Sequence, residues 1–400
     1  MNDSLQNNNK RTAGVITAAA LVSIFIYSFV VSLPGILINE VVDTFALEGT
    51  DTGLMGSFVN LGFMLSLFIV ILIQGRALKT TVLAIALAAQ AIMLFICGFS
   101  PMFYILCIGC VLIGFSGGFI DTFSNSAIVD VRKKESTRYL GYLHGLFGVG
   151  SLLSPLLLIW MLRYTSWRGV HYVLAVTSIL TVLLIYLLTR GRGGQRNQAT
   201  THEQLFSKAD LVMYFREKRN AFLALAGFFT MFSIASVMVW IVRYMTLRFD
   251  SAELGALSIS IYWMCATANR FLLAQLIKRA PMKFLTLGAL LSGLFILAGV
   301  LSGNAIVLCV MIGLFGVCSG HFVPVLVSES AKGYEGRTTF TTSIIMSVMS
   351  IGRIIAPISI AFASTQISLT IGMMLPVAAA AAAAICGWFS TRIRGKCAEG

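Results

Sequence analysis

Charge is scarce in this chain of 400 residues. Asp, Glu, Lys and Arg make up only 11% of the sequence, whereas a soluble domain carries about 25%. Hydrophobic residues make up 58% and the mean hydropathy is +0.88. This composition excludes an ordinary water-soluble globular protein and indicates a membrane protein.

The sequence also lacks the motifs of enzymatic chemistry. It contains no Walker lysine loop, no nucleotide-binding fold pattern and no catalytic Ser/His/Asp order in a soluble segment. Its eight cysteines lack the spacing of a metal site. We therefore expect no enzyme, no metal, no cofactor and no coupling to ATP hydrolysis, which leaves a proton or sodium gradient as the energy source.

Long apolar runs are abundant, and each is long enough to cross a hydrocarbon core of about 30 Å. The first run follows MNDSLQNNNKR and has no cleavage site after it, so we expect it to remain as a helix. The pattern predicts an all-α protein with twelve transmembrane helices, near 15–38, 53–73, 81–98, 102–129, 139–162, 170–188, 221–242, 255–276, 284–301, 305–328, 339–362 and 367–389.

Basic residues set the orientation, because cytoplasmic loops carry an excess of Lys and Arg. If both termini are cytoplasmic, 23 of the 29 Lys and Arg lie inside. The outside segments then hold Arg163, Arg168, Arg243 and Arg248. We expect a multi-pass protein of the inner membrane with both termini in the cytoplasm. The net charge of +13 reflects this bias toward an anionic leaflet and implies no nucleic-acid partner.

The two halves of the chain resemble each other at a separation of 202 or 203 residues. Gly53 and Gly255 begin similar apolar runs, SGGF at 116–119 matches SGHF at 319–322, and GSLLSP at 150–155 matches GRIIAP at 352–357. A separation of six helices keeps the direction of the chain, which predicts two parallel six-helix repeats. We expect bundles at 1–188 and 220–400 joined by a cytoplasmic linker at 189–219.

One stretch of about 45 residues resembles a known family. GFSGGFIDTFSNSAIVD followed by RYLGYLHGLFGVGSLLSP is similar to helices 4 and 5 of the fucose–galactose–glucose:proton symporter group of the major facilitator superfamily. The resemblance implies the major facilitator fold, with the solute site between the halves near mid-membrane. It also implies that Asp121 and Asn125 belong to a sugar and proton pathway.

Three departures qualify this resemblance. The segment QGRALKT lacks the aspartate that the superfamily usually carries between helices 2 and 3. The sugar-transporting members of the group carry a buried acidic residue in helix 1, and this chain has none there. The nearest acidic residue, Glu40, lies at the outer end of the helix. Asn269 precedes Arg270 where the group tends to have Gly-Arg.

Polar residues inside the predicted spans are the candidate site, because a charge at bilayer depth is costly unless it is paired, hydrated or functional. Asp121 and Asn125 share one face of a helix. A partly desolvated carboxylate holds its proton near neutral pH, so we expect Asp121 to couple transport to protons. His144 could share that proton, or it could be a neutral donor to a backbone carbonyl.

Arg270 and Arg353 leave two interpretations open. They could form ion pairs with Glu329 that hold helices together, or their planar forks could bind an anionic solute. His321 is a further candidate on the same helix as Glu329.

Aromatic and amide side chains complete the predicted pocket, since they suit the apolar face and hydroxyl rim of a sugar. Trp240 could instead belong to an interfacial aromatic belt. The pocket candidates are Tyr27, Asn60, Trp240, Tyr262, Trp263 and Asn269.

The function most consistent with these residues is secondary active transport of a small polar solute, most simply a sugar, by proton-coupled symport and alternating access. One alternative is a transporter of organic anions, or a drug or metabolite efflux antiporter, that uses Arg270 and Arg353. A non-transporting membrane sensor is the alternative of another class. The expected partners are the solute and the lipid bilayer, with the chain acting as a monomer.

Overall fold

The computed structural model describes residues 2–73, 79–132, 135–189, 208–334 and 338–393. Within these ranges the protein is helical and contains no β-strand. The chain divides into two compact units, each described here by itself. Unit 1 comprises Met1–Val41 and Phe58–His202, and unit 2 comprises Val42–Ser57 and Glu203–Gly400.

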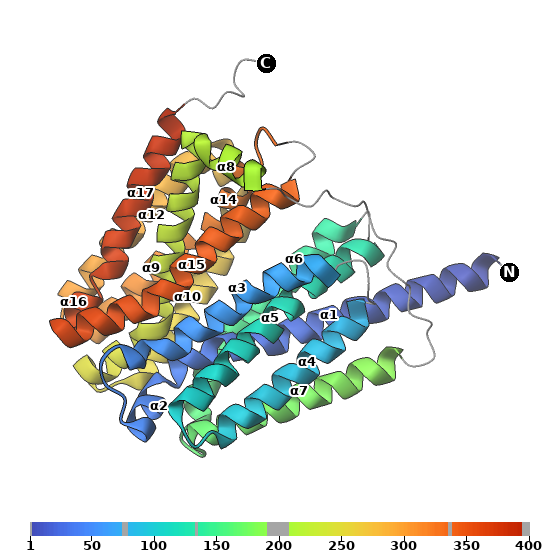
Figure 1. Ribbon diagram of the computed structural model, residues 1–400, viewed down its shortest axis with the longest axis horizontal. Helices are drawn as coiled ribbons and strands as arrows, with labels where there is room; N and C mark the ends of the chain where they lie inside the picture. The colour runs from blue at the N-terminus through green and yellow to red at the C-terminus, as the bar shows by residue number, and fades with distance from the viewer. Residues whose placement is uncertain (1, 74–78, 133–134, 190–207, 335–337, 394–400) are drawn as a thin grey trace. The chain divides into compact units, whose positions relative to one another are not determined.

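Among the described residues, unit 1 is built from six long helices, which can be followed in Figure 1. Helices α1 and α6 pack together, and α4 packs on both α5 and α7. The short helix α2 (Ile38–Phe45) follows α1. The long helices are α1 (Asn2–Ile36), α3 (Leu54–Ile73), α4 (Lys79–Phe99), α5 (Phe103–Arg132), α6 (Ser136–Met161) and α7 (Trp167–Thr189).

Unit 2 has the same plan with more interruptions. Its α9 packs on α15 and α17, and α10 packs on α13. The helices are η1 (Gly49–Gly53), α8 (Lys208–Arg216), α9 (Lys218–Phe249), α10 (Ala252–Leu272), α11 (Ala274–Arg279), α12 (Pro281–Leu301), α13 (Ala305–Ser319), α14 (Phe322–Ser330), α15 (Thr338–Gln366), α16 (Leu369–Gly372) and α17 (Leu375–Arg392).

Each of the twelve predicted apolar runs falls on one helix or on two helices that follow each other along the chain. This confirms the predicted fold class. Eleven spans among the described residues are long and apolar enough to cross a membrane. The twelfth is α10, whose sequence AELGALSISIYWMCATANRFL is diluted by polar residues. Large apolar side chains such as Phe68, Phe95 and Leu187 are more than half exposed, as expected where the solvent is lipid.

The repeat predicted from the sequence is visible in how each unit packs. Pro155 lies inside α6 and Pro357 inside α15. A side chain at Gly150 of α6 would collide with the Ser28 hydroxyl of α1, and one at Gly352 of α15 would collide with the Phe228 carbonyl of α9. The first and fifth helices of each unit therefore approach closely at matching glycines, as small-residue contacts in membranes allow.

The predicted domain boundaries and the cytoplasmic position of the termini stay predictions. Part of the expected linker at 189–219 lies outside the described residues, and α8 occupies part of the rest. Residues 42–57 group with unit 2, where Gly53 packs directly against the backbone of Pro357.

Candidate functional site

In unit 1, α5 carries the acidic candidate and its amide neighbour on one face. Asn125 Nδ2 donates to the backbone oxygen of Asp121 at 2.8 Å and lies 3.4 Å from its carboxylate Oδ1. Both side chains are partly buried. The predicted pair therefore exists as a contact, in which an amide donor faces a carboxylate inside a spanning helix.

The other unit 1 candidates lie at different distances from this pair. Tyr27 of α1 is buried and its ring covers Gly117, one helical turn before Asp121. Asn60 lies on α3 and is partly buried. His144 lies on α6 and is exposed on the surface of unit 1. The described contacts thus bring Tyr27 into the region of Asp121.

In unit 2, a break in one spanning helix organises the polar residues. Helix α13 ends at Ser319 and α14 begins at Phe322, so carbonyls near the break lose their helical partners. From α10, Asn269 Nδ2 donates to Val317 O at 2.7 Å and Arg270 Nε donates to Gly320 O at 2.8 Å. Unpaired carbonyls in a membrane cost several kcal/mol, so these donors stabilise the break.

Tyr262 lies at the centre of the unit 2 candidates. It is buried, its ring lies 5.2 Å from that of Phe315, and its hydroxyl accepts from Ser319 Oγ at 3.2 Å. This phenol therefore joins α10 to α13.

Two further candidates lie in unit 2. Arg353 places Nε and Nη2 each 3.4 Å from the sulfur of Met231, and it has other interactions besides. Trp263 is partly buried, and its ring lies 5.5 Å from that of Tyr262.

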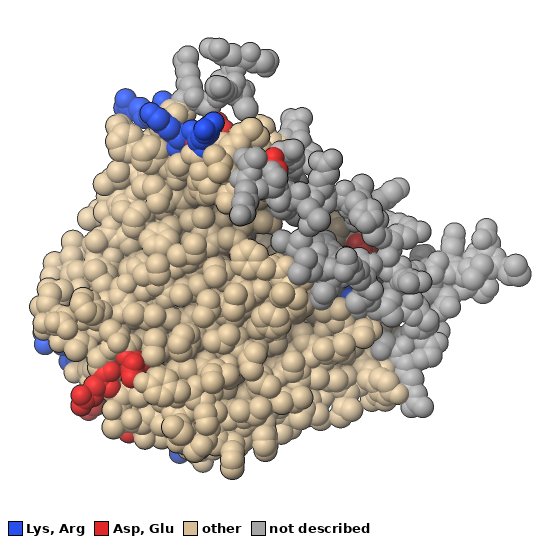
Figure 2. Space-filling view, in the orientation of Figure 1, with Lys and Arg blue, Asp and Glu red and all other residues tan. Residues whose placement is uncertain are grey.

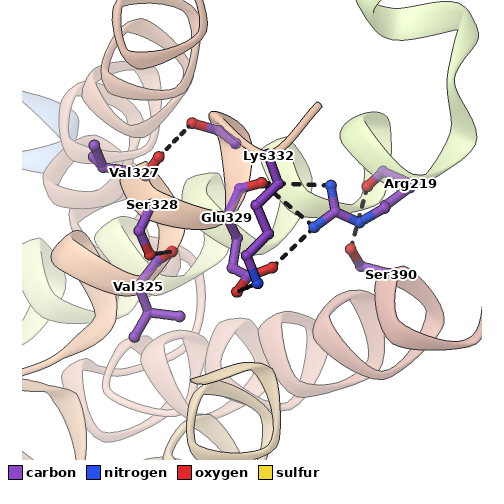
Figure 3. Close-up of polar contacts among 8 residues, drawn as sticks. Arg219, Val325, Val327, Ser328, Glu329, Lys332 and Ser390 are labelled. Carbon is purple, nitrogen blue, oxygen red and sulfur yellow. Dashed lines mark hydrogen bonds and ion pairs between the residues drawn. The ribbon is translucent and has the colours of Figure 1, made fainter. Parts of the chain in front are cut away.

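Glu329 is paired differently from the sequence-based expectation. Its carboxylate is 3% exposed and lies 2.9 Å from Arg219 Nη2 and 2.5 Å from Lys332 Nζ (Figure 3). The expected ion pair with Arg270 or Arg353 is therefore wrong. Arg219 is the better partner because it begins α9 beside the end of α14, whereas Arg270 is held at the helix break.

His321 occupies the break itself. It is buried, and its ring lies 5.3 Å from that of Phe322 and 6.3 Å from that of Phe284. Phe284 belongs to α12, so the imidazole contacts an aromatic neighbour on the α12 side of the break.

Trp240 is 1% exposed and donates through Nε1 to Pro357 O at 3.1 Å. Trp240 is therefore not an exposed residue of an interfacial aromatic belt. The same holds for Tyr244, one helical turn further on, which is also buried. This indole joins α9 to α15 within unit 2.

Comparison with known proteins identifies the family of this chain. Residues 20–357 match the family model of the Major Facilitator Superfamily. The chain belongs to the major facilitator superfamily. No curated protein matches it by sequence.

Solved structures of three transporters share the fold at low identity. A bacterial homologue of the human lysosomal transporter Spinster, in an inward-facing and unoccupied conformation, superposes with a TM-score of 0.79 at 14% identity, covering 95% of this chain and 97% of the other. The nucleoside transporter NupG gives 0.75 at 13% identity, with 95% and 99% covered. The transporter FucP, in the outward conformation, gives 0.62 at 16% identity, with 94% and 98% covered. This major facilitator protein is a transporter and not an enzyme.

Two features of this transporter escaped the sequence analysis. Arg219 was counted only among the linker charges, because the predicted span began at 221 and α9 begins at Lys218. The break at Gly320 was missed although SGHF interrupts the apolar run with Gly and His. A glycine beside a polar aromatic residue inside a span could have indicated it.

Proposed function

We propose that this transporter moves a small polar solute carrying an anionic group, and that protons drive it. Arg270, assisted by the charge of Arg353, would bind the anion, and Asp121 would carry the coupling proton. The observation that supports this choice is the pairing of Glu329 with Arg219 and Lys332. Glu329 is thereby neutralised without Arg270.

Arg270 has the geometry of an anion anchor. Its single hydrogen bond among the described residues uses Nε, so the two terminal nitrogens remain for a bidentate contact with a carboxylate or phosphate. A guanidinium inside a spanning helix is costly unless it is compensated. A bound anion would supply that compensation.

Polar groups beside Arg270 would select hydroxyls on the same solute. Asn269 is 3% exposed, and its Oδ1 has no hydrogen-bond partner among the residues described. A buried acceptor without a donor costs about 1–3 kcal/mol, which a solute hydroxyl would recover. Together with the Tyr262 hydroxyl, these groups suit a polyhydroxy acid.

Asp121 would provide the coupling. When charged it is costly in a closed, dry bundle, and when protonated it is cheap, so closure favours the neutral form. The amide of Asn125, 3.4 Å from Oδ1, would hold the charged form in place.

A neutral sugar is the second candidate, favoured by the Asp121–Asn125 pair and by the resemblance to sugar:proton symporters. Proteoliposomes holding the full chain would be tested with labelled hexoses and hexuronates, which share a ring and differ in the carboxylate. Each would be measured with and without a pH gradient. We expect gradient-driven uptake of the hexuronate.

Two variants separate the roles. Arg270→Gln should weaken hexuronate affinity by roughly 10- to 100-fold, because a hydrogen bond to a charged group contributes about 1.5–3 kcal/mol. Asp121→Asn should keep exchange but lose accumulation. Arg248→Gln, exposed at the far end of α9, is the matched control. Uptake of hexose alone, with Arg270→Gln lowering only the yield of folded protein, would disprove anion binding.

A further inference from the structure

Helix α8 lies across the end of unit 2 where α9 begins and α17 ends (Figure 1). It is fixed there by Tyr214, which is fully buried against Phe340 and Ile344 with Tyr334 beside it. Burial raises the pKa of the Tyr214 phenol, so the hydroxyl is neutral. One face of α8 is thus held firmly by unit 2.

Four apolar side chains of α8 are exposed. Leu211, Val212, Met213 and Phe215 are 44%, 55%, 57% and 37% exposed. These side chains precede the apolar span that begins at Lys218, so they lie at the level of the membrane surface. Apolar side chains exposed at that level are typical of an interfacial helix.

Exposed basic residues gather at the same end of unit 2 (Figure 2). The acidic side chains at this end are engaged. Glu217 contacts Asn220 and Tyr334, and Glu329 contacts Arg219 and Lys332. Asp210 of α8 is partly buried and has an interaction of its own. The exposed bases are Arg216, Lys218, Lys278, Arg279, Lys283, Lys332 and Arg392.

We propose that α8 and these basic residues form a binding surface for anionic phospholipid headgroups. The apolar side chains of α8 would enter the boundary between headgroups and acyl chains while Arg216 and Lys218 contact phosphate. Polybasic clusters beside spanning helices attract anionic lipid in this way. A lipid fits better than an acidic soluble protein, because four apolar side chains accompany the charges at the height where headgroups lie.

Hydrogen exchange of the full chain in nanodiscs tests the surface independently of any solute. The amides of 208–216 would be followed in phosphatidylcholine, in a mixture with phosphatidylglycerol, and in detergent. Each basic residue near an anionic surface favours binding by about fivefold. We therefore expect exchange in α8 to slow by roughly tenfold or more when phosphatidylglycerol is present.

Matched variants make the result decisive. Arg216→Gln with Lys218→Gln should remove the effect of phosphatidylglycerol and leave exchange in phosphatidylcholine unchanged, whereas Arg248→Gln should change neither. Met213→Asp should speed exchange in both bilayers. Equal exchange in the two bilayers would overturn the proposal. Equal protection in detergent as well would show that protein, not lipid, covers the apolar face.

Discussion

Replacing Glu329 by Gln should destabilise unit 2 far more than replacing its partner Lys332 by Gln. The carboxylate is 3% exposed and Arg219 is 16% exposed, whereas Lys332 is 61% exposed. The pair with Arg219 is therefore shielded from water, and the pair with Lys332 is largely solvated. Arg219 also directs both terminal nitrogens toward the Glu329 carbonyl at 3.4 Å.

These exposures set the expected magnitudes. Removing one partner of a buried ion pair costs about 3–5 kcal/mol, because the other charge remains buried. Since Arg219 keeps some contact with water, we expect Glu329→Gln to cost about 3 kcal/mol. An exposed pair contributes about 0–1 kcal/mol, which is the range expected for Lys332→Gln.

Thermal unfolding with a thiol-reactive dye can measure the difference. Cys97, Cys107, Cys110, Cys309 and Cys386 are buried and free, so the dye reports loss of packing. For a unit of about 200 residues, 1 kcal/mol corresponds to roughly 2–4 °C in Tm. Glu329→Gln should thus lower Tm by about 6–12 °C, and Lys332→Gln by less than about 4 °C.

A double variant adds a control. Arg219→Gln combined with Glu329→Gln removes both buried charges, so its Tm should lie above that of Arg219→Gln alone. If Glu329→Gln shifts Tm no more than Lys332→Gln does, the buried pair does not stabilise this end of unit 2. Strictly additive single and double variants would contradict the same argument.

Three further predictions follow from close contacts and topology. Gly352→Ala should cost about 1–3 kcal/mol, because the new methyl meets the backbone of α9. Gly150→Ala should cost less, because its methyl meets only side-chain atoms of Ser28 and Phe25, which can shift. Paired Tm measurements compare the two variants, and equal shifts would contradict the packing. Trp240→Phe should lower the free energy of unfolding by about 1 kcal/mol, because it loses the hydrogen bond to the Pro357 carbonyl of α15. An unchanged Tm would show that this hydrogen bond contributes little. Glu48 and Lys278 are both exposed. An impermeant thiol reagent applied to cells should label the cysteine of Glu48→Cys and not that of Lys278→Cys. The reverse labelling would show that the predicted orientation in the membrane is wrong.

The spanning helices could be predicted from the sequence because lipid demands long apolar runs with satisfied backbones. Helix α10 tests the limits of this rule, since composition alone excludes it from the spanning set. It was predicted as an apolar run at 255–276, and two further arguments agreed with that prediction. Its start at Gly255 repeats that at Gly53, and both termini on one side require an even number of spans. Short helices such as α8 and α11 were missed, since apolar length carries no information about them.

The candidate site was less predictable, because polar partners depend on where helices end. A span assigned from 221 leaves Arg219 in the linker, and the cations inside predicted spans that could pair with Glu329 are then Arg270 and Arg353. In the structure α9 begins at Lys218, which places Arg219 on a helix beside α14. A shift of one turn at a helix start therefore changed the assigned partner and, with it, the interpretation of both membrane arginines.

The internal repeat shows why that partner lies where it does. At the spacing of the repeat, Thr17 of α1 corresponds to Arg219 of α9. Thr17 Oγ1 accepts from Arg132 Nε of α5 at 2.9 Å, so the same position ties the first helix of unit 1 to its fourth. In unit 2 the two roles are exchanged between the helices. The guanidinium is that of Arg219 on the first helix, and its acceptor is the buried carboxylate of Glu329 on the fourth. Thr17 is 3% exposed, and a buried neutral acceptor that loses its donor costs about 1–3 kcal/mol. A buried carboxylate that loses its ion-pair partner costs about 3–5 kcal/mol. The contact therefore contributes more to stability in unit 2 than in unit 1.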